Sequence, residues 1–222
     1  MDAIVVKVGG SLGAYPEKLR SLCAKLTELS HRYNLIIIPG GGEFADVARK
    51  MDQRFKLSPR TSHRMAILGM DQYGLLLEDL LEVADVITDI GENMPRGNLT
   101  IFLPSAFLLK DDQLENSWDV TSDSIAVYIA KRLRIPKVLL ITDVDGIYSD
   151  DPKTHPNAKL IERLGAQALL KLNKRTSVDM FLPKLLQEFR IECVVVNGLQ
   201  PERVEAVLDK KDTVCTVITF SE

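Results

Sequence analysis

The sequence is poor in cysteine and has no long apolar run. Its 222 residues include three cysteines, Cys23, Cys193 and Cys215, whose spacing matches no metal-binding motif. We expect them to be buried, inert thiols. No apolar run approaches the ~18–20 residues of a membrane span, and residues 1–4 lack the basic and apolar regions of a secretion signal. We therefore expect a cytoplasmic protein with no membrane partner.

An excess of positive charge is also missing. Lysine and arginine total 28 against 31 acidic residues, giving a net charge of −3, so nothing favours nucleic acid as a partner. Apolar residues make up 45% and charged residues 27% of the chain, which indicates a globular protein with a full core. The length suits a single domain over residues 1–222.

Several familiar motifs are absent or incomplete. No G-x-x-x-x-G-K-[ST] sequence occurs, which excludes a P-loop enzyme. Residues 40–45 fit the dinucleotide pattern G-x-G-x-x-A, but the acidic ribose ligand expected about 20 residues later is missing from residues 57–61. The histidines His31, His63 and His155 are scattered without metal-like or triad-like neighbours, so no role is assigned to them.

What the chain does have is a regular alternation of strand-like and helix-like segments. Short apolar runs predict strands over 3–8, 35–38, 86–88, 100–103, 137–142, 193–196 and 214–219. Apolar positions at helical spacing predict helices over 16–33, 42–53, 59–81, 165–171, 179–189 and 201–209, and one capped by Thr121 or Ser122. Residues 110–116 and 143–157 are expected to be loops. The alternation predicts a three-layer α/β/α sandwich with a mostly parallel sheet.

Lys7 and the glycines after it suggest a phosphate site. Lys7 lies inside a run of valines, where a charged side chain is costly unless it meets a partner or a ligand. Gly9 and Gly10 follow directly and offer backbone N–H groups to a phosphate. The alternative is a lysine on an edge strand that extends its ammonium group to water.

The glycine triplet at residues 40–42 follows a predicted strand and opens a predicted helix. Glycine lets the backbone approach a phosphate closely, and the helix N-terminus adds positive potential. A flexible turn is the simpler alternative. Asp123 lies in the first turn of its predicted helix, where an acid commonly serves only as a partner of the helix dipole. Lys184 could likewise be an ordinary surface lysine.

Taken together, these segments resemble the amino acid kinase superfamily, whose members include acetylglutamate, aspartate, carbamate, uridylate and isopentenyl phosphate kinases. No single segment is specific to this superfamily. Their order and spacing together are specific, and they extend over nearly the whole chain. The matching segments are Lys7–Ser11, Pro39–Gly42, Val120–Asp123, Thr142–Tyr148, Asp151–Pro152 and Met180–Lys184.

The resemblance implies an ATP-dependent kinase with Lys7, Asp123 and Lys184 as its catalytic residues. The two lysines would flank the phosphoryl group in transfer, where charge is spread over its oxygens, and Asp123 would hold both lysines in place. An acceptor-binding half would cover about residues 1–120 and an ATP-binding half about residues 121–222. Mg²⁺ would be carried by the ATP phosphates, with no protein ligand assigned to it. A homo-oligomer is implied as well.

The same resemblance supplies the binding residues. Those implied for ATP are Gly9, Gly10, Ser11, Thr142, Asp143, Asp145, Gly146, Tyr148, Pro152 and Lys153. The acceptor would lie against Gly40, Gly41 and Gly42.

The short length and the segment Trp118–Ala126 resemble most the small kinases of methanofuran biosynthesis, which convert [5-(aminomethyl)furan-3-yl]methyl phosphate to its diphosphate. Such an acceptor carries an ammonium group, which Glu43 could pair with, and a phosphate, which Arg60 or Arg64 could bind through two parallel hydrogen bonds. These side chains could instead be solvated. The alternatives for the whole protein are a uridylate or carboxylate kinase of the same fold, and a non-catalytic nucleotide-binding protein.

Overall fold

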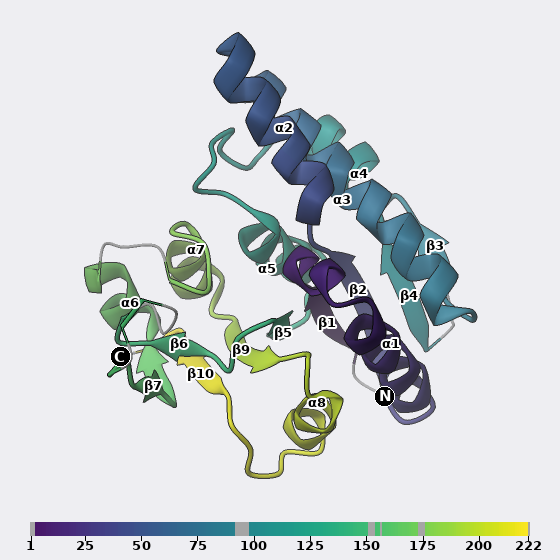
Figure 1. The fold of residues 1–222 in the computed structure, drawn as a ribbon, viewed down its shortest axis with the longest axis vertical. Coiled ribbons are helices and arrows are strands. Elements are labelled where there is room, and N and C mark those ends of the chain that lie inside the picture. Colours follow the sequence, from purple (N-terminus) through teal and green to yellow (C-terminus); the bar gives the residue numbers. More distant parts are fainter. Residues whose placement is uncertain (1–2, 92–97, 151–153, 156, 173–175, 222) are drawn as a thin grey trace.

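A mostly parallel sheet of eight strands forms the centre of the computed structural model, which describes residues 3–91, 98–150, 154–155, 157–172 and 176–221 (Figure 1). Its strand order is β3-β4-β2-β1-β5-β9-β10-β8, and only the β9–β10 pair is antiparallel. The strands are β1 (Ala3–Val8), β2 (Asn34–Pro39), β3 (Asp85–Ile87), β4 (Leu99–Phe102), β5 (Lys137–Thr142), β8 (Arg163–Gly165), β9 (Glu192–Asn197) and β10 (Thr216–Thr219). The predicted fold class is therefore confirmed.

Helices cover both faces of this sheet. They are the short 3-10 helix η1 (Gly10–Ala14), α1 (Pro16–Ser30), α2 (Gly42–Phe55), α3 (Pro59–Leu81), α4 (Ser105–Asp111), α5 (Ser122–Arg132), α6 (Ala166–Leu172), α7 (Leu182–Phe189) and α8 (Pro201–Leu208). Strand side chains alternate between two apolar clusters, so Val5 packs with α5 and α7, whereas Val6 packs with α1 and α8. None of the helices within the described part of the chain is long and apolar enough to cross a membrane.

The differences from the sequence prediction are short elements. Helix α4 occupies residues 105–111, so Lys110 ends a helix rather than beginning a loop. Its seven residues are too few to show a clear period, and the buried ring of Phe107 packs edge-on against Phe102, with 5.9 Å between the ring centroids. Strand β6 (Ile147–Tyr148), inside the predicted loop 143–157, pairs with β7 (Leu160–Ile161), which follows that loop. Helix α7 begins at Leu182 rather than at residue 179.

Helix α3 continues without a break past Gly69, which the helix propensity of glycine did not favour. A Cβ at Gly69 would lie 2.8 Å from the backbone nitrogen of Ala45. The glycine therefore serves the close approach of α2 and α3 rather than a break in the helix.

The topology brings three loops to one edge of the sheet. Strand β1 lies between β2 and β5, and Val8 is level with Pro39 on one side and Ile141 on the other. From β1 the chain passes to β2, then to β3 at the edge of the sheet and back to β4 between these two strands, before it crosses to the other side of β1 at β5. Such a reversal opens a crevice at the carboxyl ends of the strands, where open α/β sheets bind their ligands.

Candidate active site

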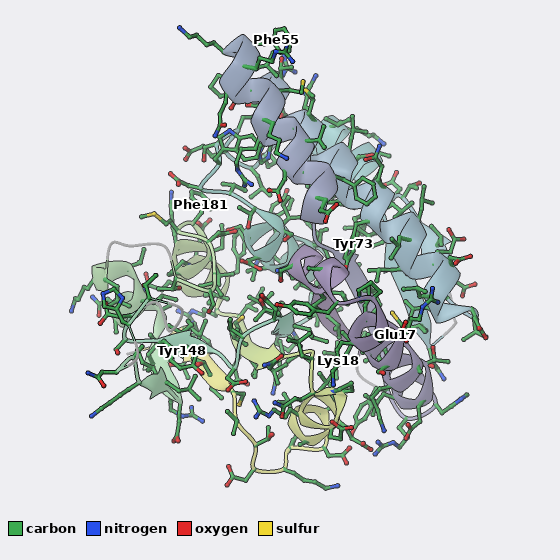
Figure 2. All side chains as sticks on the ribbon, in the orientation of Figure 1. Glu17, Lys18, Phe55, Tyr73, Tyr148 and Phe181 are labelled. Atoms are coloured by element: carbon green, nitrogen blue, oxygen red, sulfur yellow. The ribbon has the colours of Figure 1, made fainter. Side chains whose placement is uncertain are left out.

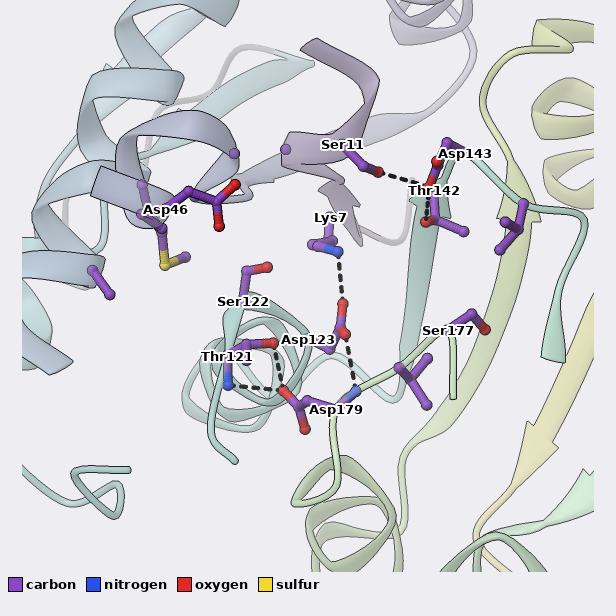
Figure 3. Close-up of a pocket in the computed structure, with 18 of the residues that line it drawn as sticks. Lys7, Ser11, Asp46, Thr121, Ser122, Asp123, Thr142, Asp143, Ser177 and Asp179 are labelled. Atoms are coloured by element: carbon purple, nitrogen blue, oxygen red, sulfur yellow. Dashed lines mark hydrogen bonds and ion pairs between the residues drawn. The ribbon is translucent and has the colours of Figure 1, made fainter. Parts of the chain in front are cut away.

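A cavity of about 1100 Å³ lies at the carboxyl ends of β1, β2 and β5 (Figure 3). Lys7, Gly10 and Gly42 line its inner end together with Asp123 and Asp143. Its volume exceeds the ~300–1,000 Å³ typical of a pocket for one ligand. Its volume is that of a large ligand-binding pocket.

A buried ion pair lies at the inner end. Lys7 is the fifth residue of β1, and its Nζ is 2.7 Å from Oδ1 of Asp123 in the first turn of α5. The two residues are only 8% and 6% exposed. Two buried charges offset each other's desolvation when they pair this closely. Lys7 is thus held inside the protein and does not reach past an edge strand to water.

The second oxygen of Asp123 is held by a residue that the sequence analysis missed. Asp123 Oδ2 accepts a hydrogen bond of 3.2 Å from the backbone N–H of Asp179. The side chain of Asp179 in turn accepts bonds from the N-terminal turn of α5: Oδ2 from the N–H groups of Thr121 (2.9 Å) and Ser124 (3.0 Å), and Oδ1 from the hydroxyl of Ser124 (2.6 Å). The Thr121 hydroxyl donates to Oδ2 as well, at 2.9 Å. Asp179 therefore fixes the turn that carries Asp123.

Asp179 also caps α7. Its Oδ1 accepts hydrogen bonds from the N–H groups of Phe181 (3.2 Å) and Leu182 (2.8 Å). Burial and the nearby carboxylate of Asp123 raise the pKa of Asp179, and hydrogen bonds from Ser124 and Thr121 oppose that rise. Asp179 lies two residues before the N-cap Phe181, and an acid at such a position can accept the unpaired N–H groups at a helix start. This role was overlooked because the predicted helix began at residue 179 itself.

The two glycine loops touch backbone to backbone. A Cβ on Gly10 would lie 2.0 Å from the nitrogen of Gly42, and Gly42 has a φ of +52°, a conformation that favours glycine. Gly10, Gly41 and Gly42 line the cavity, and their binding of phosphate stays a prediction.

Gly9 and Gly40 require a correction. The N–H of Gly9 donates to the carbonyl of Ile141 at 2.8 Å, and the N–H of Gly40 donates to the carbonyl of Val8 at 2.8 Å. Both N–H groups are already paired, so these two glycines serve the close packing of the loops. Neither residue is among those that line the cavity in the described part of the chain.

The predicted nucleotide side is partly assembled around Asp143. Ser11 donates a hydrogen bond of 2.8 Å from its hydroxyl to Asp143 Oδ1. Thr142, Gly146 and Tyr148 also line the cavity. The predicted residues Pro152 and Lys153 lie outside the described residues.

Asp145 does not line the cavity, contrary to the prediction. It accepts hydrogen bonds from Asn197 (2.8 Å) and Arg203 (2.5 Å) instead. Burial alone would raise the pKa of Asp145, but these two partners hold it below its usual value. Asp145 therefore ties the loop to β9 and α8.

Lys184 lies apart from the ion pair. It is exposed on α7, and its Nζ lies 4.9 Å from the centroid of the Phe181 ring. Asp123 does not bridge the two lysines, since its oxygens meet Lys7 and the N–H of Asp179. The structure thus brings together two of the three predicted catalytic residues.

The predicted acceptor arginines point elsewhere. Arg60, in the first turn of α3, is 62% exposed and lies 3.7 Å from Asp112, outside the cavity. Arg64 does not line the cavity either, whereas Glu43 does. The arginine that lines it is Arg49, on α2.

Other cavity residues carried no recognised motif. Asp46 and Trp118 line the cavity beside Arg49, and so does His63, to which no role was assigned. Burial lowers the pKa of His63, which favours a neutral imidazole. The one usable signal was spacing, because residues 42, 46 and 49 share one face of a helix.

Comparisons with known proteins find relatives over nearly the whole chain. The model of the amino acid kinase family matches residues 2–197. The chain is 38% identical over 216 residues to the [5-(aminomethyl)furan-3-yl]methyl phosphate kinase of Methanocaldococcus jannaschii, covering 96% of each. It is 25% identical over 232 residues to the uridylate kinase of Methanosarcina barkeri, covering 94% of this chain and 92% of that protein.

Solved structures share the fold. The UMP kinase of Ureaplasma parvum superimposes with a TM-score of 0.76 at 22% identity, covering 98% of both chains. The aspartate kinase of Synechocystis has a TM-score of 0.68 at 18% identity, covering 98% of this chain and 39% of its own.

Replacing Asp179 tests its part in holding the site together. Asp179→Asn places an amide donor against N–H and hydroxyl donors, and we expect a loss of unfolding free energy of about 2–3 kcal/mol. Urea unfolding measures this loss. Asp112→Asn, at an exposed acid, is the matched control and should change stability by less than about 0.5 kcal/mol. Equal effects of the two substitutions would contradict the assigned role of Asp179.

Proposed function

The chain belongs to the amino acid kinase family and is a phosphotransferase, and from that premise we propose that it transfers the γ-phosphoryl group of ATP to [5-(aminomethyl)furan-3-yl]methyl phosphate. The observation that carries this acceptor is the similarity to the Methanocaldococcus jannaschii kinase of that name, which is well above the similarity to the uridylate kinases. The product would be the corresponding diphosphate. Because ATP is a cytoplasmic metabolite, the proposed place of action is the cytoplasm.

The cavity supports an in-line transfer. A phosphate oxygen of the acceptor forms a bond to the γ-phosphorus, the bond from that phosphorus to the β–γ bridging oxygen breaks, and ADP leaves. Such reactions need positioning and positive charge more than proton transfer. Lys7 would supply the charge at the inner end, and Gly10 and Gly42, which line the same cavity, would offer backbone N–H groups.

Magnesium fits this site as a companion of the nucleotide. Mg²⁺ neutralises phosphate charge and is commonly held by the phosphates and only one or two carboxylates. The described residues form no group of three or more histidine, cysteine or acidic side chains that could hold a metal by themselves. Such a donor set suits an ion that arrives with ATP.

We assign the two sides of the cavity to the two substrates. The nucleotide would lie against the loops that follow β5 and precede α7, in the ATP-binding half of about residues 121–222. The acceptor would lie against α2 and α3, in the half of about residues 1–120. The two halves meet at Lys7 and Asp123, where the phosphoryl group passes.

The proposed reaction is tested by ADP release with Mg-ATP and a panel of acceptors. The panel holds the furan phosphate, UMP, isopentenyl phosphate, N-acetylglutamate, aspartate and carbamate. We expect turnover with the furan phosphate and a diphosphate product by mass spectrometry. Preference for UMP would overturn the proposed acceptor in favour of the second candidate function, a uridylate kinase. The 25% identity to such an enzyme supports this candidate. Absence of turnover with every acceptor would favour a non-catalytic nucleotide-binding protein.

Lys184 is proposed as the second cation, reaching the phosphoryl group from the first turn of α7. Lys184→Ala should then lower kcat by about 100-fold or more while ATP binding weakens far less, because the lost charge acts on the transition state. Steady-state kinetics and ATP titration measure the two effects. Lys131→Ala is a matched control, since Lys131 Nζ also lies over a phenylalanine ring, 5.6 Å from the centroid of Phe189. An unchanged kcat in Lys184→Ala would remove Lys184 from the mechanism.

A homo-oligomer is proposed through α2 and α3. These helices expose several large apolar side chains, and Phe55 lies at the outer end of α2 (Figure 2). The exposed set on the two helices is Phe44, Val47, Phe55, Leu68, Leu75 and Leu76. An exposed apolar patch of this kind is typical of an interface.

Leu75→Glu tests this interface. Leu75 is 53% exposed, so the substitution is compatible with the folded chain but places a charge in the proposed contact. Light scattering should show a larger mass than that of one chain for the wild type and the mass of one chain for the variant. A monomeric wild type, or a variant of unchanged mass, would contradict the proposal.

A further inference from the structure

The acceptor side of the cavity contains a charged pair that the phosphoryl transfer itself does not need. Asp46 and Arg49 line the cavity from α2, with Arg49 Nη1 2.5 Å from Asp46 Oδ1. The side chain of Asp46 is 55% exposed, and none of the residues that the structure describes donates a hydrogen bond to its Oδ2. A carboxylate has two accepting oxygens, so Asp46 keeps one for a cationic ligand.

Asp46 is better placed for this than Glu43. Both side chains line the cavity, but Asp46 shares a stripe of α2 with residues 42 and 49, and Arg49 holds its carboxylate. Figure 3 shows the carboxylate of Asp46 projecting from α2 toward the space in front of Lys7. Asp46 therefore has both an orienting partner, Arg49, and a direction toward the reacting end of the cavity.

Trp118 closes the cavity beside this pair. Its Nε1 donates a hydrogen bond of 2.7 Å to Asp52 Oδ2, which attaches the segment before α5 to α2. The guanidinium carbon of Arg49 lies 4.7 Å from the centroid of the Trp118 rings. Asp52 is thus occupied, and Arg49 is held between Trp118 and Asp46.

The neighbouring helix α3 lines the cavity with apolar side chains. Ile67 and Met70 of α3 are buried in the core and line the cavity. His63, which lines the same side, is favoured as a neutral imidazole by its burial and so places no cation there. A flat ring can pack against this wall with its polar substituents directed to the two ends of the cavity.

The charges at those ends match the proposed acceptor. Its phosphate is the reacting group and must lie at the inner end, with Lys7 and the glycine loops. Asp46 is four residues beyond Gly42, which is about 6 Å along a helix axis and suits a molecule with one ring and two methylene groups between phosphate and amine. We propose that Asp46 binds the ammonium group of the acceptor, and that Arg49, stacked on Trp118, holds the carboxylate in position. This inference rests on the proposed function.

The subsite would also select against other acceptors. A nucleotide such as UMP has a neutral base, which gains nothing from a carboxylate and must desolvate it on binding. An acceptor that carries an ammonium group forms a charge-assisted hydrogen bond instead. Asp46 is therefore a specificity-determining residue that favours primary amines and disfavours neutral bases.

The test compares two acceptors in Asp46→Asn and in the wild type. One is [5-(aminomethyl)furan-3-yl]methyl phosphate, and the other carries a hydroxymethyl group in place of the aminomethyl group. For the amine, Asp46→Asn should lower kcat/KM by about 10- to 100-fold, mostly through a higher KM. For the hydroxymethyl analogue, the wild type and the variant should agree within about threefold, because no ammonium is present to lose its partner.

Two further variants make the test selective. Asp112→Asn removes an acid that lies 3.7 Å from Arg60 but outside the cavity. This control should leave kcat/KM for both acceptors unchanged. Glu43→Gln tests the rival position. An amine-dependent loss in Glu43→Gln but not in Asp46→Asn would overturn the assignment, and so would an equal loss on both acceptors in Asp46→Asn. A wild type without activity on the amine would overturn the proposed function and this subsite together, whereas an active wild type with an unaffected Asp46→Asn would overturn the subsite alone.

Discussion

The buried ion pair between Lys7 and Asp123 is the contact on which the rest of the site depends. Lys7 lies on the central strand, where an unpaired ammonium group would be costly to bury. Its partner comes from α5, so the pair joins the first half of the sheet to the second half of the chain. Asp179 completes the arrangement, because its N–H meets Asp123 and its carboxylate holds the first turns of α5 and α7. One small network thus sets the position of a cation, of its counter-ion and of two helix N-termini.

The glycines next to this network have two separate uses. Gly10 and Gly42 bring two backbones into contact beside the cavity, and a side chain on either would collide with the backbone of the other loop. Gly9 and Gly40 have their N–H groups bound to neighbouring strands and keep the loops in register. At the inner end of the cavity, glycine backbone therefore lies close to Lys7 and its partner Asp123, which suits a phosphate group that must approach both backbone and cation.

The two ends of the cavity differ in charge, and this difference bears on the choice of acceptor. The inner end has Lys7 beside the glycine loops, and the acceptor side has Asp46 beside Arg49 and Trp118. The amino acid kinase fold is shared by enzymes with unrelated acceptors, so the fold alone fixes the transfer and not the substrate. Selection falls to side chains on α2, on α3 and in the segment before α5, which lie outside the phosphate-binding loops.

The sequence by itself determined the elements and the inner end of the site. Apolar runs, helical periods and the Ser58-Pro59 helix start are local patterns, and the glycine loops after β1 and β2 follow directly from them. Only the tertiary structure decided which side chains meet. In the sequence, Asp46, Arg49 and Trp118 are ordinary polar or aromatic residues, and only the packing of α2 against the segment before α5 brings them together. Arg60 likewise meets Asp112 only in the folded chain. The physical reason is range: periodicity and capping act within a few residues, whereas contacts between side chains of different elements depend on how those elements pack.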